Sequence, residues 1–240
     1  DYVYVSQLLQ AYGIGKGIEA QRRNKPMTMG SLYWQLNDCW PVVSWSGMDS
    51  FGNWKALQYQ VKHSFEDVLL SFEREGNKLK IFLINDKMQP LFGDLEMEIV
   101  DFNGNVLKNY KTELFVEKNA STSVFQINLD EFEKRENELF IRAKYLESTS
   151  HYFLVKPKKL KLTKAKIDVE IEKTSSGFQI KLKSDVLQKN LFLDSTIKGE
   201  FSENYFDLLP KTSYSIEFKT KAKEFKLENL KIKSLNDLVD

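Results

Sequence analysis

The stretch LSFEREGNKLKIFLI, residues 70–84, decides the fold class of most of the chain. Apolar and polar residues alternate on both sides of Gly76-Asn77, and a period of two residues is typical of a strand with one buried face. A Gly-Asn pair between two such runs is a turn signal, because both residues tolerate the backbone angles of a tight turn. The stretch therefore predicts a β-hairpin.

Similar short runs continue along the chain on the C-terminal side of this hairpin. Strands are expected at residues 95–100, from 106 onward, at 124–129, 139–143 and 152–155, and then at 167–172, 178–183, 191–193, 213–218 and 225–227. Many short strands at regular spacing indicate antiparallel sandwiches. The sequence thus predicts two of them in succession.

The boundary between the two sets of strands is marked by charge. Residues 156–166 hold six lysines and Pro157, which indicates a linker that runs into an edge strand. Residues 1–62 carry 6 basic and 4 acidic side chains, residues 63–155 carry 11 and 17, and residues 156–240 carry 18 and 13. Three units with different surfaces explain this alternation of sign.

The overall composition excludes several classes of function. The formal net charge of the 240 residues is +1, which gives no argument for nucleic acid or an anionic membrane. One cysteine excludes an internal disulfide framework and a cysteine-based zinc site, and the two histidines are isolated, so no metal or cofactor is expected. No apolar run is long enough for a membrane span. Asp1 is not a natural first residue, so we expect a piece of a longer protein.

The first 62 residues follow a different pattern. Apolar residues at helical spacing over residues 5–18 predict a helix that ends near Asn24. Gly13, Gly15 and Gly17 lie inside it, and each costs a helix about 1 kcal/mol relative to alanine. We therefore expect the helix backbone to approach a neighbouring element closely.

A buried strand and a second helix are expected next. Residues 29–36 are apolar with little alternation, as in a parallel strand covered on both faces. Trp54, Leu57 and Val61 fall on one face of a helix. Helix, buried strand, loop and helix in this order are typical of an α/β barrel or a doubly wound sheet.

All four tryptophans of the chain lie between Trp34 and Trp54, and Gln35, Asn37 and Asp38 alternate near the end of the expected strand. In α/β barrels the active site is built at the carboxyl ends of the strands. Tryptophan faces there stack on sugar rings, and Asn and Asp hydrogen-bond to hydroxyl groups. On composition alone, a tryptophan-rich core beneath a loop explains the stretch equally well.

Three motifs resemble one enzyme family. Residues 30–41 (GSLYWQLNDCWP), with Ser44-Trp45 and residues 52–59 (GNWKALQY), look like the last barrel strand and helix of family 2 β-mannosidases. Residues 10–23 resemble the barrel helix before them. Residues 201–210 (FSENYFDLLP) resemble a motif of the immunoglobulin-like domain that ends these enzymes.

The resemblance implies a mainly β chain: a helix-strand-helix remnant of a (β/α)8 barrel at residues 1–64, then immunoglobulin-like β-sandwiches at residues 65–155 and 156–240. It also implies the C-terminal portion of a retaining exo-β-mannosidase, which removes terminal β-linked mannose from an oligosaccharide or glycan. The family suggests a periplasmic, secreted or lysosomal location. The oligomeric state is left open.

The catalytic groups of such an enzyme are not expected in this chain. Retaining hydrolysis needs two carboxylic acids about 5–5.5 Å apart. The resemblance places both, as glutamates, on earlier barrel strands, and between Gly30 and Trp54 only Asp38 and Asp49 are acidic. Residues 1–240 alone are therefore expected to be inactive.

The resemblance gives Trp34 a place in the wall of the mannose pocket, with Asn37 and Asp38 as further substrate-binding candidates. Asn37 and Asp38 either hold the loop or reach the sugar, and for Asp38 the loop role is favoured. Trp40 and Trp45, together with Cys39, are expected to pack beneath the loop.

Two alternatives stay open at this point. The sandwiches could form a carbohydrate-binding or adhesion module without an enzyme, or the parent could be another family 2 exo-glycosidase, acting on β-glucosamine or β-galactose. If isolated, the barrel remnant would expose apolar surface that normally faces the barrel.

Overall fold

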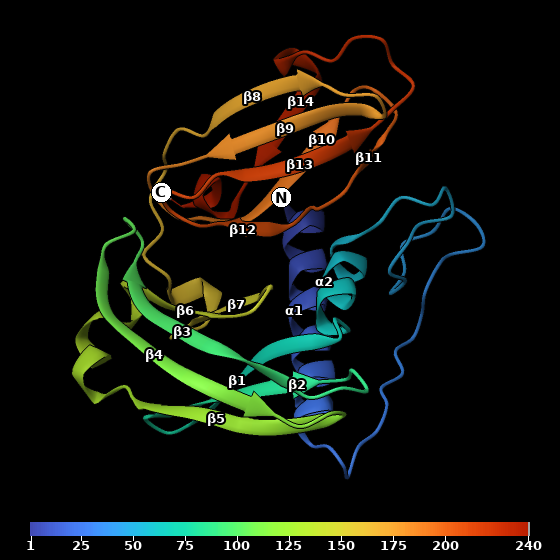
Figure 1. Cartoon of the computed structure of the whole chain (residues 1–240). Helices are drawn as coiled ribbons and strands as arrows, with labels where there is room; N and C mark the ends of the chain where they lie inside the picture. Colours follow the sequence, from blue (N-terminus) through green and yellow to red (C-terminus); the bar gives the residue numbers. More distant parts are fainter. Residues whose placement is uncertain (240) are drawn as a thin grey trace. The chain divides into compact units, whose positions relative to one another are not determined.

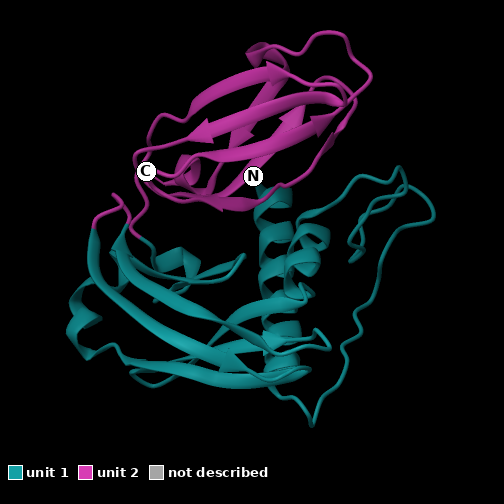
Figure 2. Cartoon of the chain, viewed as in Figure 1, with its two compact units in different colours: residues 1–101, 106–160 teal, residues 102–105, 161–240 magenta. Residues whose placement is uncertain are grey.

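A computed structural model describes residues 1–239, which form two compact units (Figure 2). The first unit comprises residues 1–101 and 106–160, and the second comprises residues 102–105 and 161–239. Antiparallel sheets dominate both units, so the mainly β fold class is confirmed. The boundary that the sequence predicts between residues 64 and 65 falls inside the first unit and stays a prediction.

Two helices open the first unit, α1 (Tyr2–Arg23) and α2 (Ala56–Ser64), and both were expected. Ile18 of α1 is buried with Leu57 and Val61 of α2. A Cβ atom at Gly15 would lie 2.7 Å from Cγ of Gln60, whereas at Gly13 it would meet nothing within 4 Å. The close approach predicted from the glycines is therefore confirmed at Gly15 only.

The predicted strand at residues 29–36 is wrong. In the segment between the helices, pairing is limited to isolated bridges that join Met48 to Asn37 and to Trp54. A strand is stabilised by hydrogen bonds to a neighbouring strand, and no strand of the described chain pairs with residues 29–36. Leu32, expected to be buried, is fully exposed.

The rest of the first unit is a sandwich of two antiparallel sheets (Figure 1). In order across the sheet, the first holds β1 (Val68–Glu75), β2 (Lys78–Asn85) and β5 (Ala120–Asn128); the second holds β4 (Val106–Val116), β3 (Leu91–Asp101), β6 (Leu139–Tyr145) and β7 (Ser148–Phe153). Glu75 pairs with Lys78 across Gly76-Asn77, which confirms the predicted hairpin. The short helix η1 (Asp130–Glu138) follows β5.

The core of this sandwich comes from the alternate positions that the period of two selects. Its large, fully buried members on β1, β2, β3 and β6 are Leu70, Leu79, Ile81, Leu83, Leu95, Met97, Ile99, Leu139, Ile141 and Tyr145.

The second unit is also a sandwich of two antiparallel sheets. The first sheet holds β11 (Glu200–Phe201), β13 (Tyr214–Lys219), β9 (Gly177–Lys183) and β8 (Asp168–Lys173); the second holds β12 (Phe206–Leu208), β10 (Gln188–Ser195) and β14 (Leu230–Lys233). The short helices are η2 (Pro157–Lys159), which belongs to the first unit, η3 (Leu227–Asn229) and η4 (Leu235–Leu238).

The second sandwich departs from the prediction at residues 225–227, and it also holds three strands that the sequence does not predict, β11, β12 and β14. Residues 225–227 are not a strand; they lead into η3, and β14 follows. Phe225 is nonetheless buried, with its ring centroid 4.7 Å from that of Phe218 and 5.6 Å from that of Phe178. Its core position explains why the local pattern resembles a strand.

Among the helices of residues 1–239, none combines the length and the apolar character that crossing a membrane would require.

The glycines of α1 give a matched pair of substitutions. Gly13→Ala should stabilise the chain by up to about 1 kcal/mol, because it relieves the entropic cost of glycine and meets free space. Gly15→Ala should be less stable than Gly13→Ala by about 1–3 kcal/mol, because its methyl group would displace Gln60. Urea unfolding followed by the helical circular dichroism signal measures both, and equal stabilisation would contradict the packing described for Gly15.

Candidate functional site

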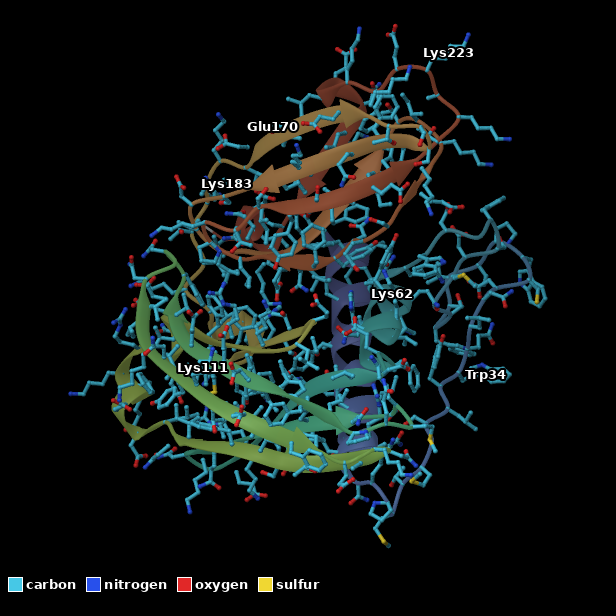
Figure 3. All side chains as sticks on the ribbon, in the orientation of Figure 1. Trp34, Lys62, Lys111, Glu170, Lys183 and Lys223 are labelled. Atoms are coloured by element: carbon cyan, nitrogen blue, oxygen red, sulfur yellow. The ribbon has the colours of Figure 1, made fainter. Side chains whose placement is uncertain are left out.

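The candidate site lies in residues 29–54, which join α1 to α2 and are called the aromatic segment below. Five large aromatic side chains of this segment are exposed: Trp34, Trp40, Trp45, Phe51 and Trp54. Trp34 is 72% exposed and projects from the extended part of the segment (Figure 3). Its flat indole faces are therefore open to a ligand.

The prediction that Trp40, Trp45 and Cys39 pack beneath the loop is wrong. All three are exposed, Trp40 by 67% and Trp45 by 59%. Trp45 is fixed through its backbone, since its carbonyl accepts a hydrogen bond of 2.7 Å from Gln10 Nε2. Burial of these indoles would need a covering element, and in the first unit no described element supplies one.

Backbone hydrogen bonds close the aromatic segment into a loop. The Asp38 amide donates to the Met48 carbonyl (3.1 Å), and the Met48 amide donates to the Leu36 carbonyl (2.8 Å). The amide of Lys55 donates to the Gly47 carbonyl at 2.9 Å, which attaches the closed loop to the start of α2. These hydrogen bonds fix the backbone of the loop beside Trp34.

Asp38 is a buried side chain of this loop. Its Oδ1 accepts a hydrogen bond from Ser44 Oγ (2.5 Å), and its Oδ2 accepts from Ser46 Oγ (2.7 Å) and from Lys55 Nζ (3.1 Å). The hydrogen bonds from Ser44 and Ser46, with that from Lys55 and its positive charge, hold the pKa of the Asp38 carboxyl below its ordinary value. Asp38 therefore supports the loop with both of its oxygens.

Asn37 differs from Asp38 in its setting. Asn37 is exposed. Its Nδ2 donates to the backbone carbonyl of Asp38 at 3.2 Å, and its own backbone carbonyl accepts from Gln35 Nε2 at 2.8 Å. The structure thus leaves Trp34 and Asn37 accessible and turns Asp38 inward.

The sequence reasoning missed Ser44, Ser46 and Lys55 as partners of Asp38. One signal was available. Lys55 is the only basic residue between Lys25 and Lys62, and Asp38 is one of two acidic residues in the aromatic segment. An isolated pair of opposite charges in an apolar stretch is a reasonable indication of a buried ion pair.

The segment holds no pair of free carboxylates. Asp49, its other acidic residue, accepts hydrogen bonds from the amides of Phe51 and Asn53, each at 2.9 Å, and so forms a local turn. Across the described part of the chain, no group of three or more His, Cys, Asp or Glu residues could hold a metal ion.

Comparison with known families assigns both sandwiches. Residues 77–159 match the model of a mannosidase Ig/CBM-like domain, and residues 162–238 match that of an Ig-fold domain of the mannosidase type.

Curated relatives match most of the chain. The chain is 26% identical to a β-mannosidase A of Aspergillus terreus over 90% of its length, and 27% identical to a β-mannosidase of Mus musculus over 88%. It spans 26% of the length of each of these proteins.

Solved structures agree. The crystal structure of a β-D-mannosidase from Dictyoglomus thermophilum matches 98% of this chain with a TM-score of 0.85 and 30% identity, and the chain covers 30% of it. An exo-chitosanase of Amycolatopsis orientalis, 14% identical with a TM-score of 0.68, shares the fold. The resemblance to β-mannosidases that the three sequence motifs indicate is thereby confirmed.

The Asp38 network should respond to acid. In the unfolded chain the carboxyl group has its ordinary pKa of 3.8, and folding lowers that pKa. The network therefore stabilises the fold fully above pH 3.8 and loses this effect as the pH falls through the lower folded pKa. The difference in urea unfolding midpoint between the unmodified chain and Asp38→Asn should be constant at neutral and mildly acidic pH and shrink in stronger acid. A difference independent of pH would contradict this assignment.

Proposed function

We propose that this chain, which matches the models of two immunoglobulin-like mannosidase domains, forms the C-terminal portion of a retaining exo-β-mannosidase. The observation that supports this most strongly is the similarity to the Dictyoglomus thermophilum β-D-mannosidase, which extends over the helices, the aromatic segment and both sandwiches. The likeness to an exo-chitosanase concerns the fold alone. The choice of mannose over glucosamine therefore rests on the β-mannosidase relatives.

The exposed apolar surface of the first unit supports a barrel origin. Leu9 and Tyr12 of α1 are 71% and 49% exposed, and Leu32, Val43 and Trp40 of the aromatic segment are exposed as well. Soluble proteins rarely leave apolar patches of this kind uncovered. We propose that the other strands and helices of a (β/α)8 barrel cover this surface in the parent enzyme.

In this proposal each residue of the site has a separate role. Trp34 stacks on the ring of the terminal mannose, and Asn37 offers an amide to its hydroxyl groups. Asp38 keeps the loop closed without touching the sugar. The two carboxylic acids that break the glycosidic bond come from other barrel strands, and the aromatic segment orients the substrate between them.

Replacement of Trp34 in the parent enzyme tests its role. Trp34→Ala should lower kcat/KM for an aryl β-mannoside on the order of a hundredfold, because the sugar is no longer held in position. Thermal unfolding should stay nearly unchanged, because in this proposal the Trp34 side chain faces the sugar pocket and does not pack in the core. The control is Met88→Ala, which removes a comparably exposed apolar side chain outside the aromatic segment and should leave turnover unchanged. An equal loss of folding and activity would favour a packing role for Trp34.

Residues 1–240 alone should not hydrolyse the same substrate. Asp38 and Asp49, the acidic residues of the aromatic segment, are both engaged in loop contacts, so neither can serve as a free nucleophile opposite an acid. Purified residues 1–240 and the parent enzyme would be assayed side by side on an aryl β-mannoside. Turnover by residues 1–240 above the uncatalysed rate would overturn this part of the proposal.

A further inference from the structure

Arg22, in the last turn of α1, connects three parts of the first unit. It is 5% exposed. Its guanidinium donates to the carbonyls of Ser64 and Glu66, the latter at 2.7 Å, where α2 ends. It also donates to Asp86 Oδ2 at 3.0 Å, in the turn that follows β2. One buried side chain therefore joins both helices to the first sandwich.

Neighbouring contacts attach the same end of α1 to the sandwich. Lys25 pairs with Asp86 as well, and its Nζ donates to Asn119 Oδ1 at 3.1 Å beside β5. Arg23 Nη1 donates to Ser71 Oγ of β1 (2.7 Å), and Ser71 Oγ donates to Glu19 Oε2 of α1 (3.0 Å). Figure 1 shows this end of α1 beside the sheet of β1, β2 and β5. The C-terminal half of α1 is thus fixed to the sandwich.

The N-terminal half of the same helix contacts the aromatic segment. Gln10 Nε2 donates to the Trp45 carbonyl at 2.7 Å, and Gln7 Oε1 accepts from the amide of Ala56 at 3.2 Å. Ala56 follows Lys55, the partner of Asp38. A helix of 22 residues is a continuous rod of about 33 Å. Whatever fixes one end of α1 therefore fixes the loop contacts at the other.

We propose that Arg22 is a positioning residue, and that the first sandwich serves through it as a brace that sets the place of the aromatic segment. Arginine suits this role because its planar fork of donors can serve two carbonyls and a carboxylate at once. Loss of the fork would leave these acceptors without their donor in a partly buried place, and α1 and α2 would be free to shift against the sandwich. The proposal concerns mechanical coupling within the first unit and does not depend on the sugar.

Hydrogen exchange of residues 1–240, read by mass spectrometry, tests the coupling. In Arg22→Met, amides of α2 and of residues 35–48 should exchange faster by about tenfold to a hundredfold. Without Arg22, these regions can open locally without the cost of breaking its charged hydrogen bonds. Amides of β3 and β6, in the sandwich core, should keep their protection. A merely stabilising residue would instead raise exchange in all these elements together, and that uniform result would overturn the proposal.

Two milder variants and one control keep the test decisive if Arg22→Met folds poorly. Arg22→Lys keeps the charge opposite Asp86 but loses the fork, and Asp86→Asn keeps an acceptor but loses the charge, so each should produce part of the local effect. The control, Arg74→Met, removes donors to Leu154 O (2.6 Å) and Glu136 Oε1 (2.7 Å) inside the same unit. Unchanged exchange at residues 35–48 in the Arg22 and Asp86 variants, or an equal change in the control, would refute the coupling.

Discussion

A β-strand becomes part of a regular sheet only when its backbone groups pair with those of a neighbouring strand, and this constraint explains which extended parts of the chain are regular. In both units, runs with a period of two pair with each other and close over an apolar core. Residues 29–36 are as apolar as these runs, yet they have no pairing partner in the described chain and stay extended and exposed. An apolar composition favours a strand, but a strand forms only where another strand is available to pair with it.

Buried and half-buried ion pairs specify arrangement in this molecule, whereas exposed ones contribute little. Lys55 with Asp38 closes the aromatic loop, and Arg22 with Asp86 joins helix to sandwich. In the second unit, Lys189 Nζ lies 2.8 Å from Asp207 Oδ1, and both residues are buried. Asp207 belongs to the motif FSENYFDLLP, so this motif supplies one side of a buried ion pair that connects β10 with β12.

The sequence predicts those features that depend on neighbours along the chain. The hairpin at Gly76-Asn77 and the end of α1 near Asn24 follow from local patterns and agree with the structure. The short strands β11 and β12, of two and three residues, are too brief to show a period. Their existence depends on partners elsewhere in the second sandwich.

The candidate site shows the same division. Resemblance identifies Trp34, Asn37 and Asp38, but local pattern could not show that Asp38 turns inward while Trp40 and Trp45 face outward. Two of the hydrogen bonds that hold Asp38 inward come from Ser46 and Lys55, eight and seventeen positions along the chain. Arg22 is further still from its partner Asp86, at 64 positions, and a basic residue at a helix end is ordinary in a sequence. Contacts across such separations become visible only in the folded chain.

The confinement of all four tryptophans to the aromatic segment divides the molecule optically. The two sandwiches contain phenylalanine and tyrosine but no tryptophan, and their ring clusters, such as that of Phe178, Phe218 and Phe225, are silent when indole is excited selectively. Intrinsic fluorescence of this chain therefore reports on a single loop. A change in emission would follow the opening, covering or occupation of that loop, whereas the second sandwich contributes no indole signal of its own.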